Sequence, residues 1–151
     1  MSTMISDNFM QLLATKKVDF TATTGDAFNI ILMVSGFVFN RVTHIHYSDV
    51  IASELATANG YTRGAKVLAG TVVTLDTTNH KVVVSWTNPS WTITPAAVTA
   101  SGAIIYDDTI TTPDADPIVE YIDFGGDYTQ DPGGNFVLTN VTVDIGKVTG
   151  V

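Results

Sequence analysis

The feature that most constrains the fold is a set of short apolar runs in which hydrophobic side chains recur at every second position. Residues 71–76 read TVVTLD and residues 81–87 read KVVVSWT, with the turn-forming stretch TTNH between them. In an extended strand Val82, Val84 and Trp86 point to one face, and mostly polar residues point to the other. This pattern predicts a half-buried β-hairpin.

Similar runs continue to the end of the chain and stop at proline, glycine or aspartate, the residues that favour turns. Further strands are therefore predicted at 28–39, 91–94, 98–106, 117–124, 135–139 and 141–146. Residues 8–14 are predicted to form a short helix, and 50–58 a short helix or an irregular turn. Many short strands indicate an all-β fold, which we predict to be an antiparallel β-sandwich or a jelly-roll-like barrel with one or two short helices.

The length of the chain sets the expected number of domains. A chain of 151 residues has an ordinary single-domain size and can bury a hydrophobic core without disulfides or a structural metal. We predict one β-sandwich domain over residues 1–151, in which residues 1–15 form an N-terminal arm or a short helix. The absence of cysteine excludes disulfides and thiolate metal sites. The N-terminal sequence does not predict a secretory signal, and no apolar run approaches the ~20 residues of a membrane span.

The balance of charge and hydrophobicity points to protein partners. Seven Lys and Arg residues stand against fifteen Asp and Glu, for a formal net charge of −8, and phosphate backbones repel such a surface. Neither nucleic acid nor a membrane is therefore an expected partner. Only 15% of residues are charged while 45% are hydrophobic, and the mean hydropathy is +0.25. A monomer of this composition leaves apolar patches uncovered, so we expect surfaces that contact other subunits.

Aspartates gather in two loops, at 107–116 and at 127–131. Their carboxylates are ligands of the kind that calcium prefers, but the spacing lacks the alternating oxygens and the sixth-position glycine of an EF-hand. Aspartate also starts turns and keeps a hairpin tip solvated, which is the interpretation we favour. No metal ligand is assigned, and cation binding by either loop stays an open alternative.

No group of residues matches a catalytic motif. The triplet Asp123-Phe124-Gly125 resembles the magnesium-binding triplet of protein kinases, but the other signature segments of those enzymes are missing. Gly125 and Gly126 instead predict a turn after Phe124, whose ring is expected to pack inward. A nucleophile elbow, a cysteine nucleophile and a phosphate-binding loop are missing as well. We therefore predict that the chain is not an enzyme and uses no cofactor.

Two histidines and two tryptophans allow alternative interpretations. His44 and His46 would share a face of an extended segment and begin a zinc site, but a structural zinc needs four ligands and the spacing does not supply them. Surface histidines are therefore favoured. Trp86 and Trp91 would stack on a sugar if they were exposed, although a tryptophan beside strand valines is more often part of a core.

The order of segments resembles a family of small virion proteins of tailed bacteriophages. The matching parts are residues 60–109 and PIVEYIDFGGD at 117–127, followed by a glycine-rich turn and two closing strands, and residues 8–19 fit more loosely. The positions that fit the family pattern are Gly60-Tyr61, Trp91, Gly102 to Tyr106 and Tyr121 to Gly125. The loop at 36–49, which is more apolar than the pattern, and the ending GKVTGV depart from it.

These proteins are similar to capsid decoration, or cement, proteins, and the resemblance implies a function of that class. It implies assembly in the host cytoplasm and binding, as a dimer or trimer, to the outer surface of the head, where the chain stabilises contacts between major capsid protein subunits. A neck, tail or head-fibre component and a carbohydrate-binding β-sandwich module are the alternatives. The apolar segments 1–15 and 36–49 place candidate contacts at Ile5, Phe9, Leu12, Phe37, Phe39 and Tyr47.

Overall fold

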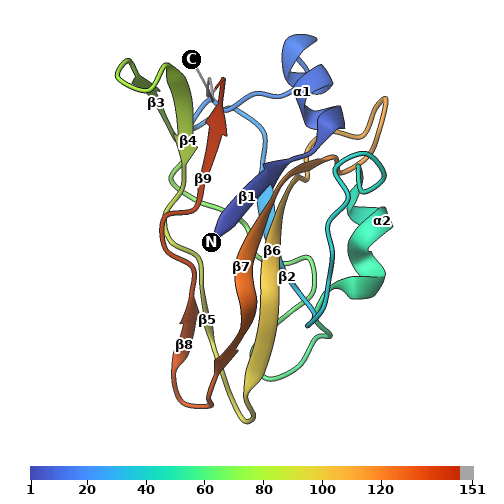
Figure 1. Cartoon of the computed structure of the whole chain (residues 1–151), viewed down its shortest axis with the longest axis vertical. Helices are drawn as coiled ribbons and strands as arrows, with labels where there is room; N and C mark the ends of the chain where they lie inside the picture. Colours follow the sequence, from blue (N-terminus) through green and yellow to red (C-terminus); the bar gives the residue numbers. More distant parts are fainter. Residues whose placement is uncertain (147–151) are drawn as a thin grey trace.

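The structure, a computed structural model, describes residues 1–146 and consists mainly of antiparallel strands (Figure 1). Its elements in chain order are β1 (Ser2–Ile5), α1 (Asp7–Ala14), β2 (Phe28–Met33), α2 (Tyr47–Val50), the 3₁₀ turn η1 (Ile51–Ser53), β3 (Val72–Asp76), β4 (Lys81–Ser85), β5 (Ser90–Thr92), β6 (Val98–Asp107), β7 (Ile118–Gln130), β8 (Asn135–Val137) and β9 (Thr142–Ile145). The prediction of an all-β fold with one or two short helices is confirmed, and there are two. Most of the ending GKVTGV lies outside the described residues.

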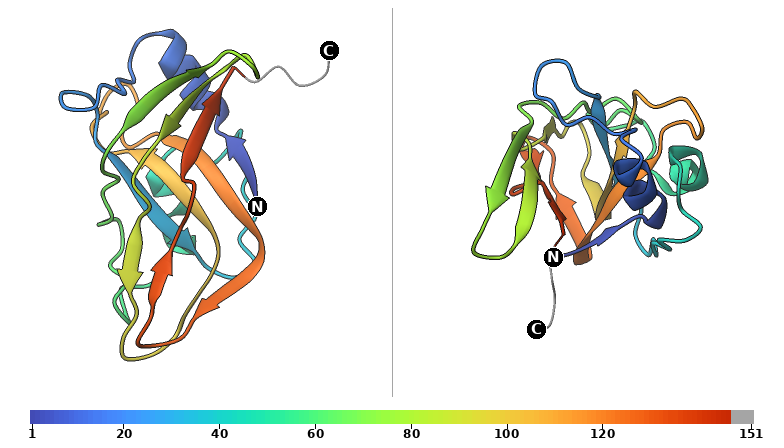
Figure 2. Two further views of the ribbon diagram at one scale, coloured as in Figure 1. Left: turned by 90° about the vertical axis from the view of Figure 1, so that its left-hand side faces the viewer. Right: turned by 90° about the horizontal axis from the view of Figure 1, so that it is seen from above.

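The strands form two facing layers (Figure 2). The first layer is a four-stranded sheet in the order β1-β7-β6-β2. The second layer is divided into a three-stranded sheet, β3-β4-β9, and a two-stranded sheet, β5-β8. All of these strand pairs are antiparallel. The divided second layer differs from the pair of continuous sheets that makes up a jelly roll.

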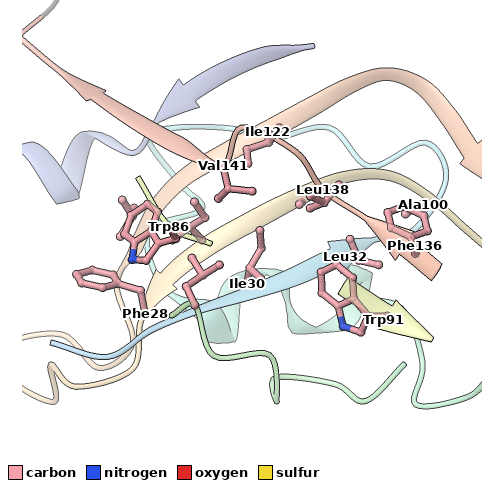
Figure 3. Close-up of a cluster of buried hydrophobic side chains, with 14 of the residues drawn as sticks. Phe28, Ile30, Leu32, Trp86, Trp91, Ala100, Ile122, Phe136, Leu138 and Val141 are labelled. Carbon is pink, nitrogen blue, oxygen red and sulfur yellow. The ribbon is translucent and has the colours of Figure 1, made fainter. Parts of the chain in front are cut away.

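The main core fills the space between the two layers (Figure 3). The first layer contributes apolar side chains of β2, β6 and β7, and the second contributes those of β4, β5, β8 and β9. Trp86 packs against Phe28 with ring centroids 5.5 Å apart, and Trp91 packs edge-on against Phe136. Both tryptophans are buried in this core, so neither presents a ring face on which a sugar would stack.

A second, smaller core covers the opposite face of the first layer. Residues 37–50 lie across that face, and Phe39 stacks on Tyr121 with ring centroids 5.3 Å apart. β2 is therefore buried on both faces, as its apolar run predicts. It ends at Met33 and not at 39, because the chain turns through Gly36, whose φ is +76°, and folds back onto the sheet.

The turn predicted at Gly125-Gly126 is instead a bulge inside β7. Gly102 pairs with Asp123 and Ala100 pairs with Tyr128, so the four residues between Asp123 and Tyr128 face the single residue between Ala100 and Gly102. Both glycines have positive φ values, +79° and +155°, which bend the strand without ending it. Phe124 packs against the main core, as predicted.

The N-terminal residues form both a strand and a helix. β1 pairs with β7 over the register Ser2 to Asp123 through Ile5 to Glu120, and α1 follows directly after Ser6. The helix was expected from the apolar spacing at 8–14, whereas a four-residue strand leaves too short a pattern to detect. Phe9 and Leu12, on one face of α1, are buried.

Candidate functional site

The buried carboxylate with the most hydrogen bonds belongs to Glu54, which follows η1. Its Oε1 accepts hydrogen bonds from the Tyr61 hydroxyl and from the Gly64 N–H, each at 2.7 Å, and its Oε2 accepts one from the Tyr47 hydroxyl at 2.6 Å. Arg63 Nε lies 3.7 Å from Oε2. Both carboxylate oxygens thus accept hydrogen bonds from the same chain, so Glu54 acts as a clasp for residues 47–64 and not as a free base.

The two tyrosines of this clasp are correspondingly hard to ionise. Burial raises the pKa of Tyr61 and of Tyr47, and the hydrogen bond and negative charge of Glu54 raise both further. A catalytic tyrosine needs a pKa near the working pH, and these shifts go the other way. The arrangement is therefore suited to holding the chain in place and not to proton transfer.

Asp107, at the end of β6, starts a turn as predicted but is not solvated, whereas Asp127 of the second aspartate-rich loop lies within β7. Its Oδ1 accepts hydrogen bonds from the backbone N–H groups of Thr109 and Ile110, at 2.9 and 3.2 Å, which is how an aspartate starts a turn. The side chain is completely buried. Burial, together with the nearby charge of Asp26, raises the pKa of Asp107. Within residues 1–146, no three acidic or histidine side chains are arranged to hold a metal ion.

The histidines also serve the fold. His44 stacks on Phe37 with ring centroids 5.5 Å apart, and its Nδ1 accepts the Asn40 N–H at 3.1 Å. His46 lies between the carboxylates of Asp49 and Asp114, at 3.3 and 3.4 Å. Both rings are partly buried, which corrects the expectation of surface histidines.

Three of the six candidate contact residues are part of the protein's own cores. Phe9 and Leu12 are buried beneath α1, and Phe39 is buried against Tyr121. Their assignment as contacts is therefore wrong, because apolar character outside the strands was used as a sign of exposure. Ile5, Phe37 and Tyr47 are partly buried, and the Tyr47 ring stacks on Tyr106 at 4.6 Å.

The two candidate segments nevertheless come together and carry other apolar residues that are exposed. The Asp7 N–H donates to the Arg41 carbonyl at 3.1 Å, and Arg41 Nε lies 2.5 Å from Asp7 Oδ1. In these two segments, Val38 is 80% exposed, Val42 is 65% exposed, and Met4 and Met10 are each 41% exposed. We call the set Met4, Met10, Val38 and Val42 the α1–loop surface.

A hollow of about 660 Å³ adjoins this surface. It is lined by Met4 and Met10 of the surface itself, by Arg41, and by residues of β1, β7 and the end of β9, namely Thr3, Ile5, Glu120, Asp144 and Gly146. A second hollow, of about 480 Å³, lies between the bulge of β7 and β8 and is lined by the rings of Phe124, Tyr128 and Phe136. Both hollows are open. The second is lined mainly by apolar groups, whereas the first combines apolar side chains with the charged groups of Arg41, Glu120 and Asp144, and such mixtures occur where proteins contact one another.

The exposed apolar residues of these segments could have been told from the buried ones by local periodicity in the sequence. Val38 lies between Phe37 and Phe39 in an extended stretch, and period two places it on the opposite side from the phenylalanines. Met10 follows Phe9 on α1, where one residue turns the side chain by about 100°. Local periodicity thus separates the exposed residues from the buried ones.

Compared with protein-family models, with curated proteins and with solved structures, the chain gives no significant match. None of the helices within residues 1–146 is long and apolar enough to cross a bilayer.

Proposed function

We propose that the protein is a capsid decoration, or cement, protein of a tailed bacteriophage, which stabilises contacts between major capsid protein subunits on the outer surface of the head. The observation that carries this proposal is the α1–loop surface, whose four exposed apolar side chains belong to the two segments that the Asp7–Arg41 pair joins. Exposed apolar patches rimmed by polar groups are typical of protein–protein contacts. The segment order that resembles small phage virion proteins supports the same class.

The polar interior supports adhesion over catalysis. Both oxygens of Glu54 accept hydrogen bonds from its own chain, and Asp107 is buried and accepts hydrogen bonds from the turn that follows it. Neither is paired with a nucleophile in an open hollow, which is the arrangement that catalysis requires. These two groups favour the proposal of a protein that acts by binding.

A capsid lattice offers many identical sites, which suits a protein that binds through a contact of ordinary size. A standard interface buries about 1,600 Å² in total, which is enough for a stable contact. Repetition of the contact across a lattice, by linked copies, raises the overall avidity without new chemistry. The formal net charge of −8 keeps decorated particles apart and does not attract the packaged DNA.

Replacing Val42 or Val38 by lysine is expected to weaken head binding at least ~10-fold, because each change places a charge in an apolar contact and 1.4 kcal/mol suffices for that factor. The measurement is co-sedimentation with heads that were assembled without the protein from the major capsid protein of the same phage. Val67→Lys is the matched control, because Val67 is also exposed but lies outside the α1–loop surface. Equal binding by all three variants would remove this surface from the proposal.

Labelling of intact particles separates the alternatives. Signal over the whole head is expected for a decoration protein, whereas signal at a single vertex would instead assign the protein to the neck or tail. Protein that binds heads nowhere would overturn the proposed function altogether.

A further inference from the structure

β3 combines exposed apolar side chains with an unpaired edge. Val72 is 55% exposed, Val73 is 52% exposed and Leu75 is 69% exposed. The strand order β3-β4-β9 gives β3 one neighbour, and its other edge pairs with no strand in residues 1–146. The hairpin lies at the side of the molecule away from α2 (Figures 1 and 2). Its backbone donors and acceptors are therefore accessible to another strand.

The edge of β3 has few of the features that keep natural edge strands from pairing, namely its short length and the charge of Asp76 at its end. Residues 67–75 read VLAGTVVTL, which contains neither a charged residue nor a proline. The β3–β4 register runs without a shift over all five pairs, so no bulge turns the edge away. Charges, prolines and bulges are the usual protection of exposed edges. None of the three is present from Val72 to Leu75, and this exposed apolar stretch points to a partner strand.

We propose that β3 is a self-association site, at which β3 of a second copy pairs with it in antiparallel orientation about a two-fold axis. Pairing over the full strand places the axis at Thr74, so that Val73 lies opposite Leu75 of the second copy and Thr74 lies opposite its own equivalent. The two three-stranded sheets then form one continuous six-stranded sheet. Symmetric contacts of this kind are the commonest in protein dimers.

Side-chain positions favour this pairing. Val73 and Leu75 share a face of the hairpin with Val84 and Val82, their partners on β4. In the dimer, Val73 and Leu75 of both copies form one aliphatic cluster across the axis, a type of cross-strand pair that stabilises sheets.

Charge does not oppose a second copy at this strand, although it does over most of the surface. Each copy carries a formal net charge of −8, so two copies repel wherever acidic residues meet. β3 carries one charge, Asp76, which lies opposite Val72 of the second copy in this register. The two Asp76 residues are then about 13 Å apart along the strands, beyond a Debye length of about 8 Å. A five-residue strand covers less than the roughly 800 Å² per partner of a standard interface, so the dimer is weak and reversible.

Sedimentation velocity from micromolar to millimolar protein tests the proposal. We expect a dimer fraction that grows with concentration, and a drop in association constant of at least ~10-fold for Leu75→Lys and for Val73→Lys. Both side chains are exposed, so these variants keep their fold. Val38→Lys, which adds the same charge on the α1–loop surface, is expected to dimerise like the parent protein. A monomer at every concentration, or a dimer unaffected by Leu75→Lys, would overturn the proposal.

Cysteine cross-linking tests the register, because the chain has no cysteine of its own. Thr74→Cys places two thiols opposite each other across the axis, where paired Cα atoms lie about 4.5–5.5 Å apart and a disulfide can form. Val72→Cys is the control, because the two introduced cysteines would lie at opposite ends of the paired strands, too far apart for a disulfide. Under mild oxidation Thr74→Cys is expected to cross-link at least ~10-fold faster, by the distance dependence of disulfide formation, and equal rates would contradict the pairing. Both tests use the free protein, so their results do not depend on whether the protein binds phage heads.

Discussion

Replacing Glu54 by alanine is expected to lower the free energy of unfolding by about 3–5 kcal/mol, the range for removing one partner of a buried charged network. The change leaves the hydroxyls of Tyr47 and Tyr61 and the N–H of Gly64 without their acceptor. Buried donors without a partner keep their full desolvation penalty. Urea unfolding of the variant and the parent protein, with equal slopes, measures the difference.

Two further variants separate the clasp from simple loss of packing. Tyr47→Phe removes one donor and leaves the carboxylate with its other partners, so a loss of about 1 kcal/mol is expected. Glu54→Gln keeps the size of the side chain and one acceptor oxygen, and it should fall between the two. If Glu54→Ala were as stable as Tyr47→Phe, the carboxylate would not be what holds residues 47–64 in place.

The residues of the family-like pattern have structural explanations in this fold. Gly60 has a φ of +87°, and a Cβ there would lie 1.9 Å from the Thr92 carbonyl oxygen. A Cβ on Gly102 would lie 2.5 Å from the Tyr121 ring. The Tyr61 hydroxyl joins Glu54 to the backbone N–H of Leu32. These positions specify how the chain folds, whereas the exposed residues of the α1–loop surface lie in and near the segments that match the pattern loosely or depart from it.

Period-two spacing predicts the central part of the fold well. The hairpin expected from 71–76 and 81–87 is found at Val72–Asp76 and Lys81–Ser85, with a short turn between the strands. Only β4 is half-buried, with Val84 in the core, whereas the β3 residues 72–75 are all exposed, so the predicted burial is wrong for that strand. The bulge in β7 escapes this reasoning. A glycine pair marks a departure from regular geometry, and only pairing with β6 decides whether that departure is a turn or a bend.

Buried polar groups were not predictable in the same way. Glu54 meets donors from positions 47, 61 and 64, which have no common period and lie on a helix and on irregular segments. Phe9, Leu12 and Phe39 show the opposite difficulty, since an apolar side chain looks the same in sequence whether it faces its own core or a partner. Tertiary packing decides both cases, and local patterns describe only one element at a time.

The unfolding free energy is expected to fall as pH rises from about 5 to about 9, and Glu120→Gln should remove a large part of that fall. Burial raises the pKa of Glu120 to about 8, the charge of Asp144 adds to the shift, and a hydrogen bond with Thr3 opposes it. Between the ordinary glutamate pKa and about 8, the unfolded chain releases this proton while the folded chain keeps it. Rising pH therefore favours unfolding, by up to about 4 kcal/mol for a shift of this size.

Glutamine has the same shape but no proton to release, so its contribution does not change with pH. Urea unfolding of both proteins at about pH 5 and about pH 9 measures the two slopes. The parent protein also contains Asp107, whose pKa is raised and which adds a fall of the same sign, so the test is the difference between the slopes. Because Glu120 lines the hollow beside the α1–loop surface, its ionisation also changes the charge presented there. Parallel pH profiles for the two proteins would mean that the Glu120 carboxyl is ionised in the folded chain at neutral pH.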